Sequence, residues 1–153
     1  MERHLDQDCV IAVCEKINIE GWGPWSNKAG VIHVRPTPAV LERMIAIRIH
    51  LDDCSDDNGA LRVIPGSHLA GFLSDDEIRH RSKEAAVICA VCRGDAILMR
   101  PLLLHSSPPA KTPSNRRVVH LEFAAEELPY GAKWHDRIPD KTLGDDKTAL
   151  HDQ

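Results

Sequence analysis

The chain has 153 residues, of which 42% are hydrophobic and 27% charged, so it can bury one substantial core. Its net charge of -4 argues against a nucleic-acid-binding protein, because such proteins normally show a basic surface. No apolar run approaches the roughly eighteen residues of a membrane helix, and the first residues do not resemble a signal peptide. Five cysteines make an odd count, so we expect reduced thiols and a cytoplasmic protein.

The chain opens on a short polar motif that directly precedes an apolar, strand-like run. The motif reads His4-Leu5-Asp6-Gln7-Asp8. If it extends the strand, His4, Asp6 and Asp8 project to one side, because side chains alternate along a strand. A His-x-Asp pair combined with a distant histidine is the ligand set of non-haem Fe(II) sites that keep open positions. The alternative is a frayed polar terminus.

Residues 15–40 are rich in glycine and proline and predict an irregular loop. A loop of this length in a small domain is either a functional lid or disordered. Trp22 and Trp25 favour an ordered lid, because both need something to pack against, although they could equally line a partner interface.

Residues 44–51 alternate in character and predict a strand. The odd-numbered residues, three isoleucines and Leu51, share one face, which we expect to be core. The even-numbered face carries Arg48 and His50, so we expect it to meet solvent or a polar cavity. These two residues, with Trp22 and Trp25, are our candidates for the border of a substrate pocket.

The middle of the chain predicts short strands and a single helix. Asn58-Gly59 marks a hairpin turn before a strand at 60–64, and a further strand is expected at 86–91. Between them, Ser74 and Glu77 form a capping-box pattern, which predicts a helix from there to about Lys83.

Residues 94–123 predict two strands around a polar loop. His105 ends an apolar run, and Arg116 opens the next strand, so both can face the same cavity. A neutral imidazole is a good ligand for iron, zinc or copper, and a guanidinium grips a carboxylate through two hydrogen bonds. The alternative is a strand-end histidine and an exposed loop arginine.

Several short strands, one helix and a polar strand face predict a mainly β fold, a jelly roll able to hold a site between its two sheets. We expect one domain over residues 1–127, followed by a polar tail over residues 128–153.

Residues 49–53, 57–68 and 94–99, together with His105 and Arg116, resemble the phytanoyl-CoA dioxygenase family. The most specific part is the block that begins at Asn58-Gly59 and ends in Pro-Gly-Ser-His. The resemblance covers about residues 4–125. It implies a double-stranded β-helix, which is cupin-like, and an oxygenase dependent on Fe(II) and 2-oxoglutarate.

The resemblance also implies roles for individual residues. His105 matches the distal iron-binding histidine, and Arg116 matches the arginine that pairs with the far carboxylate of 2-oxoglutarate. Ser107 matches an accessory contact to the same cosubstrate. The implied reaction is the oxidative decarboxylation of 2-oxoglutarate to succinate, coupled to hydroxylation of a small organic substrate.

The sequence departs from the family at its metal motif. Aligned without a gap, the histidine of the family's His-Gln-Asp falls on Asp6, whereas the literal His-x-Asp begins two residues earlier, at His4. The shift is even, so His4 keeps the same strand face. The metal ligands are therefore expected among His4, Asp6, Asp8 and His105. A set without His4 would be poorer in nitrogen and weaker for Fe(II).

A second departure is the small number of residues before the motif. We expect the missing N-terminal part of the family fold to leave apolar surface exposed, and therefore expect a homodimer. Two alternatives to an active or weakened oxygenase stay open. One is a truncated, non-catalytic jelly-roll module that binds partners, and the other is a cupin-like metal protein with different chemistry, such as zinc-assisted hydrolysis.

Overall fold

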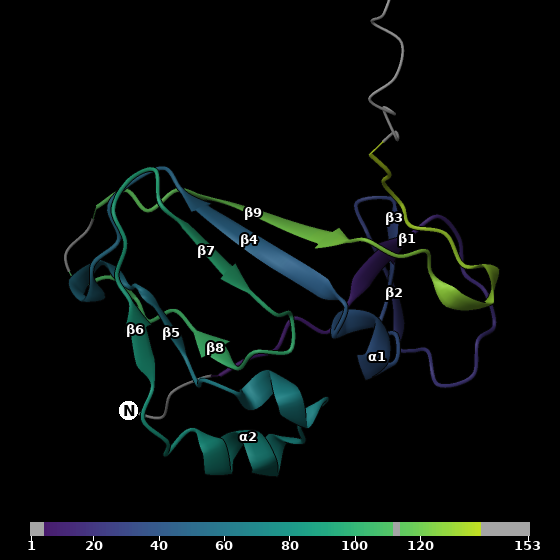
Figure 1. Cartoon of the computed structure of the whole chain (residues 1–153), viewed down its shortest axis with the longest axis horizontal. Coiled ribbons are helices and arrows are strands. Elements are labelled where there is room, and N and C mark those ends of the chain that lie inside the picture. The colour runs from purple at the N-terminus through teal and green to yellow at the C-terminus, as the bar shows by residue number, and fades with distance from the viewer. Residues whose placement is uncertain (1–4, 112–113, 139–153) are drawn as a thin grey trace, which may run out of the picture.

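The computed structural model of the chain describes residues 5–111 and 114–138. Within them, the protein is mainly β and forms three antiparallel sheets of three strands each, with two short α-helices (Figure 1). No helix in these two ranges is both long and apolar enough to cross a bilayer.

Two of the sheets form the jelly roll and lie opposite one another in Figure 1. The first sheet has the order β7-β4-β9, with β4 over Met44–His50, β7 over Ala96–Met99 and β9 over Val118–Ala124. The second has the order β6-β5-β8, with β5 over Leu61–Val63, β6 over Val87–Cys89 and β8 over His105–Ser106. Ala46 and Met99 of the first sheet pack against Leu61 and Val63 of the second. The predicted double-stranded β-helix is therefore confirmed.

The third sheet has the order β1-β3-β2 and occupies much of the segment that the sequence predicted to be an irregular loop. Its strands are β1 (Ile11–Val13), β2 (Trp25–Lys28) and β3 (Val31–Val34), and α1 follows at Pro38–Leu41. Ala29 and Gly30 both have positive φ, at 51° and 87°, which is the geometry of a tight two-residue hairpin. The Asn27 side chain accepts the Gly30 amide at 3.0 Å. The loop prediction was wrong because the hairpin places an alanine, not a glycine, at the first turn position.

The predicted helix is confirmed. Helix α2 covers Asp75–Arg81, and its capping box is complete, with the Ser74 hydroxyl accepting the Glu77 amide and the Glu77 carboxylate accepting the Ser74 amide. Three 3-10 turns complete the elements, at Asp56–Asn58 (η1), Ser67–Ala70 (η2) and Pro129–Gly131 (η3).

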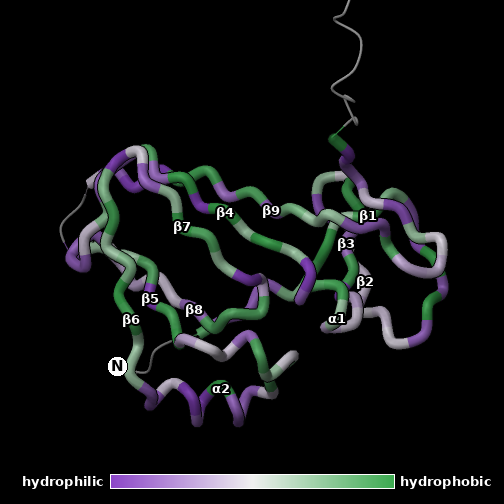
Figure 2. Tube along the Cα trace, viewed as in Figure 1, coloured by the Kyte–Doolittle hydropathy of each residue, from purple (hydrophilic) through white to green (hydrophobic). Residues whose placement is uncertain are grey.

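The isoleucine face of β4 is not the core face that the sequence predicted. Met44, Ala46 and His50 are buried, whereas Leu51 on the isoleucine face is 41% exposed. The isoleucine face lies on the outside of the sheet, where the pairing register continues it onto apolar residues of β7 and β9. Figure 2 shows how hydrophobic and hydrophilic positions alternate along these strands. The sequence prediction was wrong because a run of isoleucines marks an apolar face but does not say whether another layer covers it.

The described part of the expected tail packs against the third sheet. Leu128 and Ala132 are buried in the same cluster as Ile11 and Val13. Trp134 pairs with Val13 in an isolated bridge, and its indole donates to the Glu126 carbonyl at 2.8 Å. The boundary between residues 127 and 128 stays a prediction.

Candidate metal and cosubstrate site

The opening motif runs beside His105. The Asp6 amide donates to the His105 carbonyl at 2.9 Å, and the His105 amide donates back to the Asp6 carbonyl at 3.0 Å. Residues directly opposite in an antiparallel pair project to the same side, so Asp6 and His105 share a face. His4, the alternative first ligand, lies outside the described residues.

Asp8 and His105 bring two electron-pair donors together. The His105 Nδ1 lies 2.9 Å from the Leu103 carbonyl, which can only accept, so Nδ1 carries the proton and Nε2 keeps a free lone pair. Nε2 lies 3.9 Å from the Oδ2 of Asp8. That oxygen is buried and has no hydrogen-bond partner among the described residues. A buried, unpaired carboxylate oxygen is costly, and a cation shared with the imidazole would satisfy it.

Asp6 is placed differently from Asp8. It is exposed, and its Oδ1 accepts the amide of Gln7 at 2.8 Å. The backbone of Asp6 therefore lies beside His105, while its carboxylate is bound to the backbone of the next residue. Asp8 and His105 are the predicted metal ligands whose side chains the structure brings together.

Gln7 fixes this motif and was missed in the sequence. Its side chain is buried and donates to the carbonyls of Leu102, at 2.7 Å, and Gly71, at 3.0 Å. Its oxygen accepts the amide of Leu73 at 3.1 Å. Because neighbours on a strand point to opposite sides, anchoring Gln7 in the core presents Asp6 and Asp8 on the other face. Strand alternation alone could have indicated this role.

A second polar group, also missed, lies on the inner face of β9. In the register, His120 stands opposite Arg48 and Glu122 opposite Ala46, both on β4. One ligand atom from each of Asp8, His120 and Glu122 lies within 4.8 Å of the other two. Burial raises the pKa of Glu122, and the nearby charge of Asp8 adds to this, while His120 opposes it. The signal in the sequence was spacing: His120 and Glu122 are an even number of residues from Arg116, so on a continuous strand all three would share one face.

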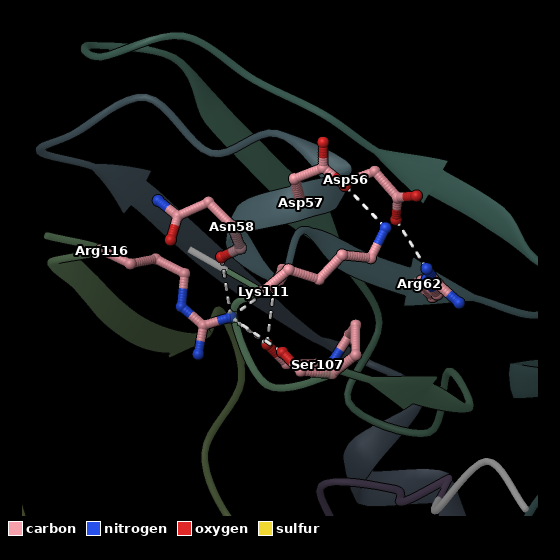
Figure 3. A network of polar contacts seen from close by, with 9 residues as sticks. Asp56, Asp57, Asn58, Arg62, Ser107, Lys111 and Arg116 are labelled. Atoms are coloured by element: carbon pink, nitrogen blue, oxygen red, sulfur yellow. Dashed lines mark hydrogen bonds and ion pairs between the residues drawn. The ribbon is translucent and has the colours of Figure 1, made fainter. Parts of the chain in front are cut away.

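The predicted cosubstrate residues Arg116 and Ser107 are in direct contact (Figure 3). The Arg116 Nη1 donates to the Ser107 hydroxyl at 2.8 Å, to the Asn58 carbonyl at 3.3 Å and to the Gly59 carbonyl. Gly59 has a φ of +76°, and a Cβ there would overlap both Nη1 of Arg116 and the Pro108 carbonyl. This turn therefore needs glycine for its conformation and for the close approach of the guanidinium.

The neighbouring Arg117 has a separate, surface role. Its amide and guanidinium hold both oxygens of Asp52, at 2.8 to 2.9 Å. These hydrogen bonds lower the pKa of Asp52 to about 2. Lys111 and Arg62 hold the adjacent turn through ion pairs with the acidic residues of η1, each at 2.6 Å (Figure 3).

Comparison with known families decides the classification. The family model described as phytanoyl-CoA dioxygenase (PhyH) matches residues 3–118. The chain belongs to the phytanoyl-CoA dioxygenase family. No curated protein matches the chain.

Solved structures similar to this family member include AviO1, EvdMO1 and SnoN. AviO1 from Streptomyces viridochromogenes Tue57 is 25% identical, with a TM-score of 0.49 over 82% of this chain and 49% of AviO1. EvdMO1 is 30% identical, with a TM-score of 0.49 over 67% of this chain and 23% of EvdMO1. SnoN, described as a non-heme alpha ketoglutarate dependent epimerase from nogalamycin biosynthesis, is 17% identical, with a TM-score of 0.40 over 77% of this chain and 41% of SnoN. The chain thus spans half or less of each of these chains.

The four substrate-pocket candidates do not form one group in this family member. Trp22 is buried in the core cluster of the third sheet, and Trp25 packs against the same cluster. Arg48 and His50 lie instead on the inner face of β4, where the Nη1 of Arg48 is 3.2 Å from the Nδ1 of His120. Arg48 and His50 are therefore the two candidates that lie toward the proposed site.

The buried histidine at position 50 predicts a pH dependence of stability. His50 is 2% exposed, and neither ring nitrogen has a hydrogen-bond partner among the described residues. Burial lowers its pKa below the usual 6.5, and the charge of Arg48 lowers it further. Between the folded and unfolded pKa values the unfolded chain binds more protons, so stability rises with pH in that window and is lost as the pH falls.

We therefore expect the free energy of unfolding to decrease as the pH falls below about 6.5. Replacing His50 with glutamine should flatten that slope, because the group that resists protonation is gone. Urea unfolding of both proteins at a series of pH values measures the difference. Equal slopes in the two proteins would contradict this account of His50.

Proposed function

We propose that this chain is an Fe(II)/2-oxoglutarate-dependent oxygenase that hydroxylates a small organic substrate. The observation that carries the proposal is the unpartnered, buried Oδ2 of Asp8, 3.9 Å from the free Nε2 of His105, in a member of this family. An imidazole and a carboxylate are ligands that suit non-haem Fe(II).

When bound, iron would supply the oxidative chemistry for decarboxylating 2-oxoglutarate and hydroxylating the substrate. Asp8 and His105 would hold the metal, and the Leu103 carbonyl keeps the ring of His105 in the ligating tautomer. Arg116 would bind the far carboxylate of 2-oxoglutarate. Ser107 and the carbonyl of Gly59 hold the guanidinium in place for that task.

One observation favours a second candidate, a non-catalytic jelly-roll module. In the gapless alignment the family's histidine position falls on Asp6, whose Oδ1 accepts the Gln7 amide. If nothing replaces the missing imidazole, iron binds weakly and the fold serves only to bind a partner. Activity of the proposed oxygenase therefore depends on what completes the ligand set at Asp8.

An anaerobic titration with Fe(II) and 2-oxoglutarate tests the proposal. An oxygenase site should give a metal-to-ligand charge-transfer band and raise the midpoint of thermal unfolding, because a ligand that binds only the folded state stabilises it by mass action. On admission of oxygen, succinate should form. A protein that binds Fe(II) but gives no band and no succinate is not an oxygenase of this class.

We also propose that the chain forms a homodimer through the outer face of the β7-β4-β9 sheet. The register puts only apolar residues of these strands on that face: Ile45, Ile47, Ile49, Ala96, Leu98, Val119, Leu121 and Phe123. Leu98 and Leu121 are 60% and 42% exposed. A face without charged groups is complementary to a second copy of itself, as a two-fold interface requires.

Light scattering after size exclusion should therefore give a dimer. Leu98→Glu should shift the protein to the monomer, because the carboxylate would lose water at the interface. Leu69→Glu is the matched control, because Leu69 is 81% exposed in η2 and away from this sheet. A monomeric wild-type protein, or a Leu98→Glu protein that stays dimeric, would refute the interface.

The cytoplasm is the proposed location of this protein. All five cysteines are free thiols. Cys54 is buried, and Cys14 and Cys92 are exposed. Free thiols in this number suit a reducing compartment.

A further inference from the structure

The group formed by Asp8, His120 and Glu122 combines side chains from two distant parts of the chain. Asp8 comes from the opening motif, while His120 and Glu122 lie two residues apart on the inner face of β9. Their ligand atoms lie within 4.8 Å of one another. About a third of each side chain is exposed, at 32%, 31% and 30%, while the Oδ2 of Asp8 itself is buried.

The charges in this group are not balanced within the described residues. Two carboxylates share the space, and the Oδ2 of Asp8 has no hydrogen-bond partner there. The guanidinium of Arg48 contacts the ring of His120 and forms an ion pair with neither carboxylate. Two close carboxylates repel each other unless a proton or a cation lies between them.

We propose that His120 and Glu122 are metal ligands and bind a divalent ion together with Asp8, so that the last strand adds an imidazole and a carboxylate to the carboxylate of the opening motif. One imidazole and two carboxylates are a donor set that suits Fe(II) or Mn(II). The inference deepens the proposed function, on which it rests for the identity of the metal as iron. Binding of a divalent ion by these three residues does not itself require 2-oxoglutarate.

In this arrangement Arg48 competes with the metal for the ring of His120. A guanidinium can only donate, so its contact with the His120 Nδ1 at 3.2 Å leaves the ring proton on Nε2, the nitrogen 3.6 Å from Glu122. A ligating imidazole needs a free lone pair toward the ion, so binding must release Arg48 from the ring. Arg48→Met should therefore tighten metal binding.

The test is calorimetric titration of the full chain with Mn(II), without 2-oxoglutarate. His120→Gln and Glu122→Gln should each weaken Mn(II) binding by about tenfold or more. Loss of a residue that only orients a ligand already costs about tenfold, and loss of a ligand should cost at least as much. Asp6→Asn is the matched control and should leave the affinity within about threefold, since the Oδ1 of Asp6 already accepts the Gln7 amide. Unchanged affinity in both β9 variants, or a large loss in Asp6→Asn, would overturn the inference.

Cobalt substitution gives a second readout, independent of affinity. Proton NMR of the Co(II) protein should show a strongly shifted, exchangeable imidazole N–H signal that disappears in His120→Gln, while circular dichroism shows that the variant is folded. A wild-type spectrum in that variant would exclude His120 as a ligand. Tight Mn(II) binding lost in both β9 variants, with no Fe(II)/2-oxoglutarate absorption band, would refute the oxygenase and leave the metal site. Succinate formation undiminished by either β9 substitution would refute His120 and Glu122 as metal ligands and leave the oxygenase.

Discussion

Replacing Arg116 with alanine is expected to weaken 2-oxoglutarate binding by about 2 kcal/mol or more, or roughly thirtyfold, because a charged carboxylate loses its partner. Arg116 is held at the end of β8 by the Ser107 hydroxyl and by the carbonyls of Asn58 and Gly59. These contacts fix the position of Nη1 in the absence of ligand. Binding of 2-oxoglutarate therefore does not have to order the guanidinium, which would cost free energy. Calorimetric titration of the metal-loaded, anaerobic protein measures the loss.

Arg117→Ala provides the matched control for that measurement. Arg117 has the same charge and is one position away, but its guanidinium is paired with Asp52 at the surface. Its removal should leave 2-oxoglutarate affinity unchanged. If Arg116→Ala behaves like Arg117→Ala, the cosubstrate does not bind at Arg116.

Gly59→Ala tests the same site indirectly. The added methyl group would overlap Nη1 of Arg116, and the positive φ would strain the turn. We expect weaker 2-oxoglutarate binding with the guanidinium still present. Ordinary affinity in Gly59→Ala would show that the turn does not position Arg116.

The parts of the fold that the sequence predicted well depend on local chemistry. The capping box of Ser74 and Glu77 specifies where α2 begins, because both hydrogen bonds form within one turn. The short strands with turns between them indicated a jelly roll. The hairpin of β2 and β3 was missed because Ala29 adopts a positive φ that residue type alone does not predict.

The faces of β4 show what local pattern cannot decide. Alternation correctly separates the isoleucine face from the face of Arg48 and His50, but burial depends on which sheet lies opposite. Ala46 is the residue packed against Leu61 and Val63 of the second sheet. A small residue on the same strand face as Arg48 and His50 gave no sign in the sequence that it faces the core.

The site was predictable where a motif fixes it and obscure where only tertiary pairing does. Asp8, His105 and Arg116 were candidates from the sequence pattern, Ser107 was implied by the family resemblance, and the structure brings the four together in two pairs. His120 joins Asp8 only through the pairing of β9 with β4, which spans 72 residues between Arg48 and His120. No local pattern carries that information.

The largest loss of stability is expected from Gln7→Ala. The Gln7 amide satisfies the carbonyls of Leu102 and Gly71 and the amide of Leu73. Each buried polar group left without a partner costs about 1–3 kcal/mol, so we expect a loss on the order of 3 kcal/mol in the free energy of unfolding. For a chain of this size that corresponds to a decrease of roughly 6–12 °C in Tm.

The same substitution should also reduce metal affinity, although Gln7 points away from the metal ligands. Its three hydrogen bonds join the opening motif to the segment between η2 and α2 and to the loop before β8, and so fix Asp8 opposite His105. Urea unfolding and Mn(II) titration of Gln7→Ala measure the two effects, with Asp6→Asn as the control for a change in the same motif at an exposed position. If Gln7→Ala lowers stability but binds Mn(II) like the wild type, Asp8 is held by the backbone pairing of the motif and not by this side chain. If stability is also unchanged, solvent reaches these backbone groups and the amide of Gln7 is not the anchor of the motif.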